Sequence, residues 1–245
     1  MSSERGLYGT LAPYYDYIYH WKDYSNESDK IRRLIQRYKR SPGNSLLDVA
    51  CGTGKHLSYL RKDFECVGVD SSPEMIAVAR EKLPDVQFVV GDMVEFDLGR
   101  RFDVVTCLFS GIGYLRSRRQ VGRAIANFSR HLSTGGLLMI EPWVRRSEWR
   151  DGSVDLQKYE SDELEIARIV YGRARGNFSV LDERYVIGEK NKGILYVKTR
   201  HVLRFFEPEE TLEDMRRSGL VAKYLKGSLT RRRGLLIGVK TGANG

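Results

Sequence analysis

The 245-residue sequence lacks the features that mark membrane, exported and metal-stapled proteins. No segment is long and apolar enough to cross a bilayer, and the N-terminus has no apolar core of a secretory signal. The three cysteines, Cys51, Cys66 and Cys107, form no CxxC pair, and all lie in one half of the chain. Their spacing argues against a disulfide framework or a metal site and predicts reduced thiols in the cytoplasm.

Negative charge is in short supply: 32 Asp and Glu face 41 Lys and Arg, which gives a net charge of +9. An excess of this sign favours anionic partners, such as nucleic acid or a phosphorylated small molecule. A well-solvated surface rich in both signs is the better explanation for most of these charges, since 30% of the residues are charged. Charge alone therefore assigns no partner.

Short apolar runs alternate with helical stretches up to about residue 143. A helix is expected at 23–40, where Pro42 and Gly43 end it. Further helices are expected at 55–62, 73–82 and 119–132, and strands at 45–50, 66–69, 87–90, 102–108 and 137–141. This alternation predicts βαβ units with right-handed crossovers and a parallel sheet.

The pattern changes between about residues 144 and 206. Alternating stretches at 164–171, 179–188 and 194–203 predict antiparallel strands with polar outer faces. A helix at 208–218 and strands at 221–225 and 235–240 follow, and these two strands are expected to rejoin the main sheet. The predicted fold is therefore α/β: a doubly wound, mostly parallel seven-stranded Rossmann-like sheet with an inserted antiparallel β-element.

The most informative segment is LLDVACGTG, at the first strand of the sheet. The strand delivers Asp48 and a turn of small residues, Ala50, Gly52 and Gly54, to its carboxyl end, where open α/β sheets bind ligands. The following helix presents free N–H groups there. Asp70 ends the second strand, eighteen residues after Gly52, and a carboxylate at that place suits the paired hydroxyls of a ribose.

Three nucleotide-binding loops compete for this segment. A dinucleotide loop, GxGxxG, would need Gly or Ala at Leu57, and a phosphate loop, GxxxxGK[ST], would need different residues at Val49 and His56. The remaining fit resembles the acidic-x-Gly-x-Gly-x-Gly loop of class I methyltransferases, with Ala50 in place of the first glycine. Alanine is small enough to keep the turn.

Other pieces of the methyltransferase pattern follow in order. Asp92 and Met93 come after the third strand, and the resemblance implies that they meet the adenine amino group and ring. Leu108 ends the fourth strand beneath the cofactor, and the LSTGG turn at 132–136 resembles the family's LxPGG passage into the fifth strand. The resemblance implies S-adenosylmethionine as cofactor. The residues expected to bind it are Tyr24, Asp48, Ala50, Gly52, Gly54, Asp70, Ser71, Met75, Asp92, Met93 and Leu108.

Further motifs narrow the resemblance. The segments YDYIY, KDY, GYL, EPW and RGL are similar to those of the N-methyltransferases of nucleotide-linked 3-amino-3,6-dideoxyhexoses, of the desosamine and mycaminose type. This similarity runs from about residue 8 to residue 239 and implies N,N-dimethylation of a dTDP-amino sugar. The chain departs from the group at 144–146, where it has Val-Arg-Arg after Glu-Pro-Trp, and at Tyr114, where some members have His.

An amine acceptor fits the chemistry, because positive charge moves from the donor sulfur to the attacking nitrogen. A neutral amine needs only desolvation and alignment, and positioning can supply about 7–11 kcal/mol of such a barrier. Tyr19 and Glu141 are the candidate catalytic residues. Tyr19 would orient the amine, accept its proton or simply cap the cofactor, and Glu141 would anchor the sugar or assist.

The candidate acceptor-binding residues are Tyr19, Tyr114, Trp143 and Arg233. Trp143 would stack on a base or pack in the core. In the run Arg231-Arg232-Arg233, a candidate diphosphate clamp, we expect only Arg233 to take part, since it alone matches the group. The four histidines show no metal-ligand spacing, and none is expected to be catalytic: His20, His56, His131 and His201.

The chain thus divides into a helical and aromatic cap (1–40), a cofactor-binding core (41–143), a β insertion that contacts substrate or forms a homodimer (144–206) and a return to the core sheet (207–245). Other functions stay open. One is methyl transfer to another amine, an oxygen or a carboxylate. A second is methylation of RNA or protein by a basic surface, although the sequence has no RNA-binding module and no Asn/Asp-Pro-Pro-Tyr motif. A third is a non-catalytic binding protein.

Overall fold

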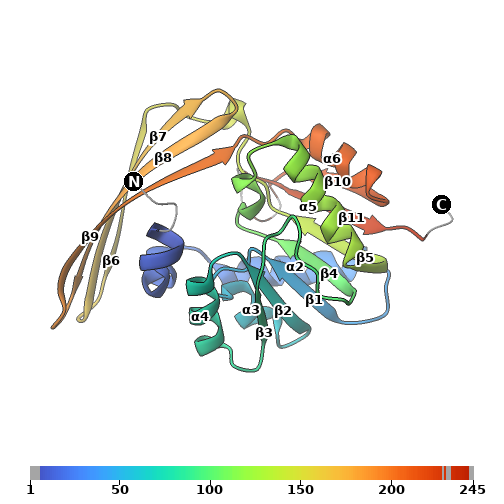
Figure 1. Ribbon diagram of the computed structural model, residues 1–245, viewed down its shortest axis with the longest axis horizontal. Coiled ribbons are helices and arrows are strands. Elements are labelled where there is room, and N and C mark those ends of the chain that lie inside the picture. The colour runs from blue at the N-terminus through green and yellow to red at the C-terminus, as the bar shows by residue number, and fades with distance from the viewer. Residues whose placement is uncertain (1–5, 228, 230–232, 243–245) are drawn as a thin grey trace.

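The computed structural model describes residues 6–227, 229 and 233–242. Within these residues the chain forms a seven-stranded sheet and a separate four-stranded sheet, with the N-terminal segment between them (Figure 1). The order of the larger sheet is β10-β11-β5-β4-β1-β2-β3. β11 (Leu235–Lys240) runs antiparallel to β5 (Leu132–Ile140) and β10 (Leu220–Leu225), whereas β1–β2, β1–β4, β2–β3 and β4–β5 are parallel pairs. The predicted mostly parallel α/β sheet is confirmed.

Helices begin where the sequence supplies capping side chains. Asp23 accepts the N–H of Asn26 at the start of α2, Ser72 accepts that of Met75 at α4, and Ser117 that of Gln120 at α5. Each cap satisfies one of the backbone donors that a helix N-terminus leaves free. The helices are α2 (Tyr24–Tyr38), α3 (Lys55–Leu60), α4 (Pro73–Lys82), α5 (Arg118–Arg130) and α6 (Pro208–Arg217).

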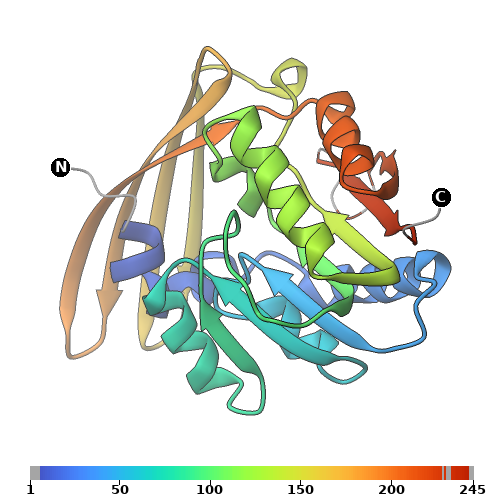
Figure 2. The ribbon, with the colours of Figure 1, turned by 45° about the vertical axis from the view of Figure 1, so that its right-hand side comes forward.

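Helices cover both faces of the large sheet (Figures 1 and 2). The first strands are β1 (Ser45–Val49), β2 (Glu65–Asp70), β3 (Gln87–Val90) and β4 (Phe102–Cys107). Along β1, Leu46 packs with α2, α3 and α4, while its neighbour Leu47 packs with α5 and α6. A strand buried on both faces needs apolar residues at successive positions, which is the pattern that these short runs show.

The passage into β5 differs from the expected turn at 132–136. β5 already begins at Leu132, which pairs with Phe102, and the register then shifts so that Leu137 pairs with Val104. Gly135, at φ 77°, lies in this irregularity, a backbone conformation that favours glycine. The predicted turn is therefore a bulge inside a longer strand.

The small sheet has the order β6-β7-β8-β9 and is antiparallel throughout its described pairs. Three of its strands match the expected stretches: β7 (Leu164–Arg175), β8 (Phe178–Glu189) and β9 (Gly193–Arg204). The sequence analysis missed the edge strand β6 (Ser153–Glu160), because its residues are mostly exposed and its apolar side chains face outward.

The expectation of polar outer faces holds only in part, because exposed apolar side chains share this face with charged ones. Cross-strand pairs face the same side, and Leu156 with Ile169, Val154 with Tyr171 and Val186 with Tyr196 are all exposed pairs. Charged residues such as Glu165 and Arg200 share this outer face. The inner face is mainly apolar but also contains the buried Arg168 and Glu183. Alternation alone shows that two faces differ, but it does not show which face is covered.

The N-terminal segment fills the space between the two sheets. It comprises η1 (Gly6–Thr10), η2 (Ala12–Tyr14) and α1 (Tyr15–Ile18). Its Leu11 is fully buried in a cluster that also contains Met75 of α4 and Tyr185 of β8. Asp16 accepts hydrogen bonds of 2.6 Å from Thr53 Oγ1 and Lys82 Nζ. The cap thus joins the core to the insertion.

We expect Leu11→Ala to lower the free energy of unfolding by about 2–5 kcal/mol, because the cluster loses apolar contacts and retains a cavity. Val221→Ala, at an exposed position of β10, should stay within about 0.5 kcal/mol of the wild type. Urea unfolding followed by circular dichroism measures both. Equal effects of the two substitutions would show that the cap is not part of the cooperative structure.

Candidate active site

The candidate site lies at the carboxyl ends of β1 and β4, where the strand order of the large sheet reverses. Ligands of open α/β sheets bind at this switch point. A cavity of about 660 Å³ opens here. Of the predicted residues, those that line it are Ala50, Gly52, Asp70, Ser71, Met75, Met93, Leu108 and Tyr114.

The loop after β1, predicted as a turn of small residues, has a left-handed backbone at three positions. Ala50, Gly52 and Gly54 have φ values of 57°, 57° and 71°. Alanine at the first position keeps the turn, as expected, but this conformation costs an L-residue about 1–2 kcal/mol. Gly111 approaches from the other side, and a Cβ there would lie 2.6 Å from Cβ of Ala50. The close approach of the two segments therefore requires a small side chain at Ala50 and no side chain at Gly111.

Asp70 holds this loop by its backbone. Its Oδ2 accepts the N–H of Gly52 at 2.8 Å and its Oδ1 accepts that of Ser72 at 2.9 Å. Burial raises the pKa of this carboxyl, while its backbone hydrogen bonds act in the opposite direction. The carboxylate thus fixes two turns at the rim of the cavity and faces its interior.

A second buried carboxylate, Asp48, lies deeper and lines a smaller adjoining cavity together with Tyr24. Burial raises its pKa to about 6, although His56 and the hydrogen bond from Thr106 act against this shift. The Thr106 hydroxyl donates to Asp48 Oδ1 at 2.7 Å.

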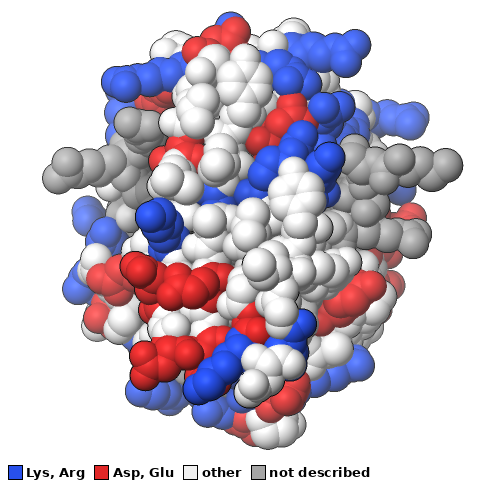
Figure 3. Space-filling view, turned by 90° about the vertical axis from the view of Figure 1, so that its left-hand side faces the viewer, with Lys and Arg blue, Asp and Glu red and all other residues white. Residues whose placement is uncertain are grey.

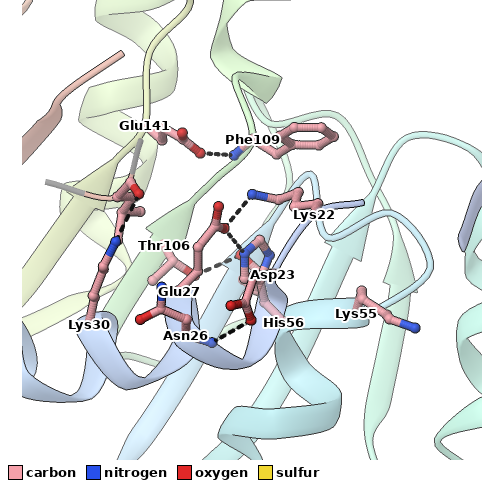
Figure 4. A network of polar contacts seen from close by, with 12 residues as sticks. Lys22, Asp23, Asn26, Glu27, Lys30, Lys55, His56, Thr106, Phe109 and Glu141 are labelled. Atoms are coloured by element: carbon pink, nitrogen blue, oxygen red, sulfur yellow. Dashed lines mark hydrogen bonds and ion pairs between the residues drawn. The ribbon is translucent and has the colours of Figure 1, made fainter. Parts of the chain in front are cut away.

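Polar contacts continue from His56 toward the cap (Figure 4). Glu27 lies between the His56 ring, whose Nε2 is 3.0 Å from Oε2, and the ammonium of Lys22. Burial acts to raise the pKa of Glu27, but the His56 hydrogen bond and the Lys22 charge outweigh it and lower that pKa. Lys22 in turn lies 4.6 Å from the ring centroid of Phe109. This network fixes the start of α2 beside the cavity.

Phe109 is at the centre of the site. It and Ser110 have φ values of 50° and 65°, so two successive non-glycine residues are strained directly after β4. The wholly buried Glu141 accepts the Phe109 N–H at 2.7 Å and so holds this strained turn (Figure 4). Glu141 is therefore placed to position Phe109.

Tyr19 packs edge-on against Phe109, with ring centroids 5.1 Å apart. Burial raises the pKa of its hydroxyl, although Arg168, whose guanidinium is 5.2 Å from the ring centroid, acts to lower it. Tyr19 also lines a second cavity of about 520 Å³, together with Tyr24 and Lys55. At neutral pH it is a phenol that donates or accepts a hydrogen bond.

Arg233 brings positive charge to the same place. Its guanidinium lies 4.8 Å from the ring centroid of Trp143 and 5.2 Å from that of Phe109. The Trp143 indole N–H donates to Ser179 Oγ of the insertion at 2.9 Å, so this ring is tied to the small sheet. Arg231 and Arg232 of the predicted clamp lie outside the described residues.

Two expected cofactor residues are not among the described residues that line these cavities. Gly54 is the N-cap of α3 and packs against Phe88, where a Cβ would lie 3.1 Å from the ring. Asp92 is exposed and accepts the N–H of Val94 at 2.8 Å.

Among the residues that the sequence analysis missed are Tyr8, which lines the large cavity, and His201, which lies behind Tyr114. Tyr8 belongs to η1, and its hydroxyl lies 2.6 Å from that of Tyr114. The Tyr114 hydroxyl is also 3.0 Å from Nδ1 of the buried His201. The alternation of β9 was the available signal, since it assigns His201 and Leu203 to one face.

Two features of the described residues bear on other functions. No group of three or more His, Cys, Asp or Glu side chains in this part of the chain is arranged to hold a metal ion. Its helices are also too short or too polar to cross a membrane.

Comparison with known proteins agrees with this geometry. Residues 46–136 match the model of the methyltransferase domain family. The chain is 35% identical to the dTDP-3-amino-3,4,6-trideoxy-alpha-D-glucopyranose N,N-dimethyltransferase of Streptomyces venezuelae, over 93% of this chain and 97% of that protein. It is 34% identical to the dTDP-4-amino-2,3,4,6-tetradeoxy-D-glucose N,N-dimethyltransferase of Saccharopolyspora spinosa, over 94% and 92%. The solved sugar N-methyltransferase KedS8 of a Streptoalloteichus species superposes with a TM-score of 0.86 at 33% identity, covering 93% of both chains.

The raised pKa of Asp48 predicts a pH dependence of stability. A carboxyl whose pKa is higher in the folded state stabilises the fold below its ordinary pKa and loses this contribution as the pH rises through about 6. Between pH 5 and pH 7 the wild type should therefore lose roughly 1 kcal/mol of unfolding free energy relative to Asp48→Asn.

Urea unfolding at several pH values measures this difference. The exposed Asp162→Asn is the matched control, and its curve should run parallel to that of the wild type. If the Asp48→Asn curve is parallel as well, the carboxyl is not desolvated in the folded protein.

Proposed function

Because this chain belongs to the family of S-adenosylmethionine-dependent dTDP-amino-sugar N,N-dimethyltransferases, we propose that it methylates the amino nitrogen of a nucleotide-linked sugar. The observation that carries the proposal is the position of Arg233. Its cation lies beside the cofactor cavity, between Phe109 and Trp143, where it can pair with a diphosphate. The similarity also extends through the cap and the insertion, which contain the rest of the acceptor side.

The cavity fits the cofactor. S-adenosylmethionine supplies an electrophilic methyl group on a sulfonium and leaves as S-adenosylhomocysteine. Gly52 and Gly111 let the backbone approach a ligand closely, and the carboxylate of Asp70 at the rim suits ribose hydroxyls. Met75 and Met93 supply apolar walls. We assign Tyr24 and Asp48, which line the adjoining cavity, to the methionine end of the cofactor.

The reaction requires a neutral, aligned amine in a site without bulk water. Aromatic rings surround the proposed position of the reacting amine; they belong to Tyr8, Tyr15, Tyr19, Phe109 and Tyr114. Ring faces attract cations, so this lining stabilises the positive charge that moves from sulfur to nitrogen. Tyr19 remains protonated because burial raises its pKa, and we assign it to orienting the amine. Glu141 acts by holding the Phe109 turn.

The alternative of an RNA or protein methyltransferase is not favoured. Relatives that match nearly the whole chain are named for small nucleotide sugars.

The three free cysteines support the proposed cytoplasmic location.

Arg233→Ala and Asp70→Asn should weaken the binding of two different ligands, the sugar nucleotide and S-adenosylhomocysteine respectively. Loss of the guanidinium should raise KM for the sugar nucleotide about 10- to 100-fold, because charge-assisted hydrogen bonds to the diphosphate disappear. Its affinity for S-adenosylhomocysteine, measured by calorimetry, should be unchanged. Asp70→Asn should instead weaken S-adenosylhomocysteine binding, with little change in KM for the sugar at saturating cofactor.

The assay uses labelled cofactor with dTDP-sugars that carry the amine at C3 or at C4, since the relatives differ in this position. Arg233→Lys is the conservative control and should recover part of the loss. Methylation of RNA with no methylation of any amino sugar would contradict the proposed acceptor. A loss of cofactor affinity in Arg233→Ala would assign that residue to the fold.

We also propose that the insertion forms a homodimer through its outer face. Uncharged residues, white in Figure 3, cover much of this face, and exposed apolar side chains are among them. These apolar side chains are Val154, Leu156, Ile169, Tyr171, Val186, Ile194 and Tyr196. Acidic Glu160 and Glu165 lie toward one end of the sheet. Toward the other end Arg173 and Arg200 both form ion pairs with Asp182, which leaves an excess of positive charge there. A two-fold axis across the sheet brings unlike ends together, so a second copy of the chain is the fitting partner.

Ile169→Asp should convert the dimer into a monomer, because it buries a carboxylate at the centre of the interface. Sedimentation equilibrium should then give the 28.2 kDa chain mass instead of twice that value. Val221→Asp, exposed on the large sheet, should remain dimeric. A monomeric wild type at assay concentrations would exclude this interface.

A further inference from the structure

A line of polar contacts, made of two hydrogen bonds and one ion-pair contact, leads from the cofactor cavity into the insertion. The hydroxyls of Tyr8 and Tyr114, which both line the cavity, are 2.6 Å apart. The Tyr114 hydroxyl lies 3.0 Å from Nδ1 of His201, and Nε2 of His201 lies 3.6 Å from Oε2 of Glu183. Three segments far apart in sequence, η1, η3 (Gly111–Tyr114) and the small sheet, thus meet in one line of polar groups.

The carboxylate at the far end gives this line a direction. Glu183 is buried and accepts hydrogen bonds from Arg168 Nη2 at 2.6 Å and from the Tyr185 hydroxyl. Burial acts to raise the pKa of Glu183, but Arg168 and His201 outweigh it and keep that pKa below its usual value. Nε2 of His201 faces this carboxylate at 3.6 Å, which is longer than a hydrogen bond. Because an ionised carboxylate has no proton to donate, we assign the proton of His201 to Nε2.

The remaining hydrogen positions follow from this tautomer. Nδ1 of His201 is then an acceptor, so the Tyr114 hydroxyl donates to it. Tyr114 therefore accepts from Tyr8, and the Tyr8 oxygen keeps a lone pair for a donor in the cavity. Every hydroxyl proton points from the cavity toward His201.

Tyr8 and Tyr114 do not ionise to phenolates, so neither is itself the final acceptor of a proton. Burial raises the pKa of Tyr8 and of Tyr114 well above the usual value of a phenol. Each of them stays neutral by accepting one proton while it gives up its own. The group in the line that can hold an added proton is His201, beside the ionised Glu183.

We propose that this line, Tyr8–Tyr114–His201–Glu183, takes a proton from the acceptor's ammonium, with His201 as the proton-accepting end. The ammonium proton passes to Tyr8 oxygen, the Tyr8 proton to Tyr114 and the Tyr114 proton to Nδ1 of His201. The nitrogen keeps its electron pair, which then forms the C–N bond as the C–S bond breaks and its electrons stay on sulfur. The proton returns to water after the products leave.

This inference rests on the function proposed above, and it answers a need of that function. An amine is bound largely as ammonium near neutral pH, and after one transfer the product nitrogen is charged again. It must lose a proton before it can attack a second methyl group. A line of donors inside the closed site does this without bulk water.

A purely structural role does not explain why charged residues are buried at the Glu183 end of the line. A buried ion pair such as Arg168–Glu183 carries a desolvation penalty that often matches or exceeds its attraction. Apolar residues would pack the same inner face at no such penalty. The titratable and charged groups that face the line from the elements packed around it are Tyr15, Tyr19, Arg168 and Tyr185.

His201→Asn separates the two roles. The Asn carbonyl can still accept the Tyr114 hydrogen bond, but it cannot hold a proton. With a saturating amino sugar, the wild-type kcat should be nearly constant between about pH 7 and pH 9. In the variant, kcat should be about 10²-fold lower than that of the wild type at pH 7. The logarithm of kcat should then rise by about one per pH unit, since only the neutral amine reacts.

Tyr114→Phe breaks the line without altering Glu183 or Arg168, and it should give the same sloping profile. His131→Asn is the matched control, since His131 is buried and hydrogen-bonded at the end of α5 but does not line the cavity. It should lower the melting temperature and leave the pH profile flat. A His201→Asn profile as flat as that of the wild type, at any absolute rate, would falsify the relay.

A second measurement is independent of the acceptor. NMR of protein with ¹⁵N-labelled histidine, without substrate, should show His201 as the Nε2–H tautomer. The opposite tautomer overturns the relay even if the enzyme is active. If the wild type methylates no amino sugar but shows the Nε2–H tautomer, the proposed acceptor is contradicted while the assigned hydrogen positions from Tyr8 to His201 are not.

Discussion

The hydrogen bond from the Gly52 N–H to Asp70 is the contact on which the rest of the site depends. It ties the loop after β1 to the end of β2, so that the left-handed turn is held although Ala50 is strained. The same carboxylate fixes Ser72, which caps α4 and donates to the Tyr8 carbonyl of the cap. One half-buried acid thereby orders the cofactor loop, a helix start and the N-terminal segment. Its raised pKa is the consequence of burial at this junction.

The acceptor side is assembled in a different way. It has no contiguous motif, because the cap contributes Tyr8 and Tyr19, the turn after β4 contributes Phe109, and the last loop contributes Arg233. The insertion closes the site from behind with His201 and Glu183. Such a site forms only when all these segments are packed. Loosening of the cap is therefore expected to affect acceptor chemistry more than the parallel sheet.

Several costs are concentrated at this place. Ala50, Phe109 and Ser110 have left-handed backbones, and Asp48, Glu27, Glu141 and Glu183 are buried acids. Strain of this kind persists only where the surrounding structure holds it, and it gathers at functional sites. Glu141 shows how this works, since its hydrogen bond from the Phe109 N–H supports the strained turn that positions the aromatic ring. The preorganised site is thus maintained at the expense of stability.

The sequence by itself determined the parallel sheet, its helices and the cofactor loop, because these depend on local patterns. Apolar runs buried on both faces, capping residues such as Ser72 and the spacing from Gly52 to Asp70 are all readable within a few tens of residues. The edge strand β6, the apolar outer face of the insertion and the bulge in β5 were not, since alternation does not tell which face is covered. Only the tertiary structure decided that Tyr8, Tyr114 and His201 form one line. Their hydroxyl and imidazole groups belong to elements up to 193 residues apart, and no local pattern records that such groups meet when the cap, the core and the insertion pack together.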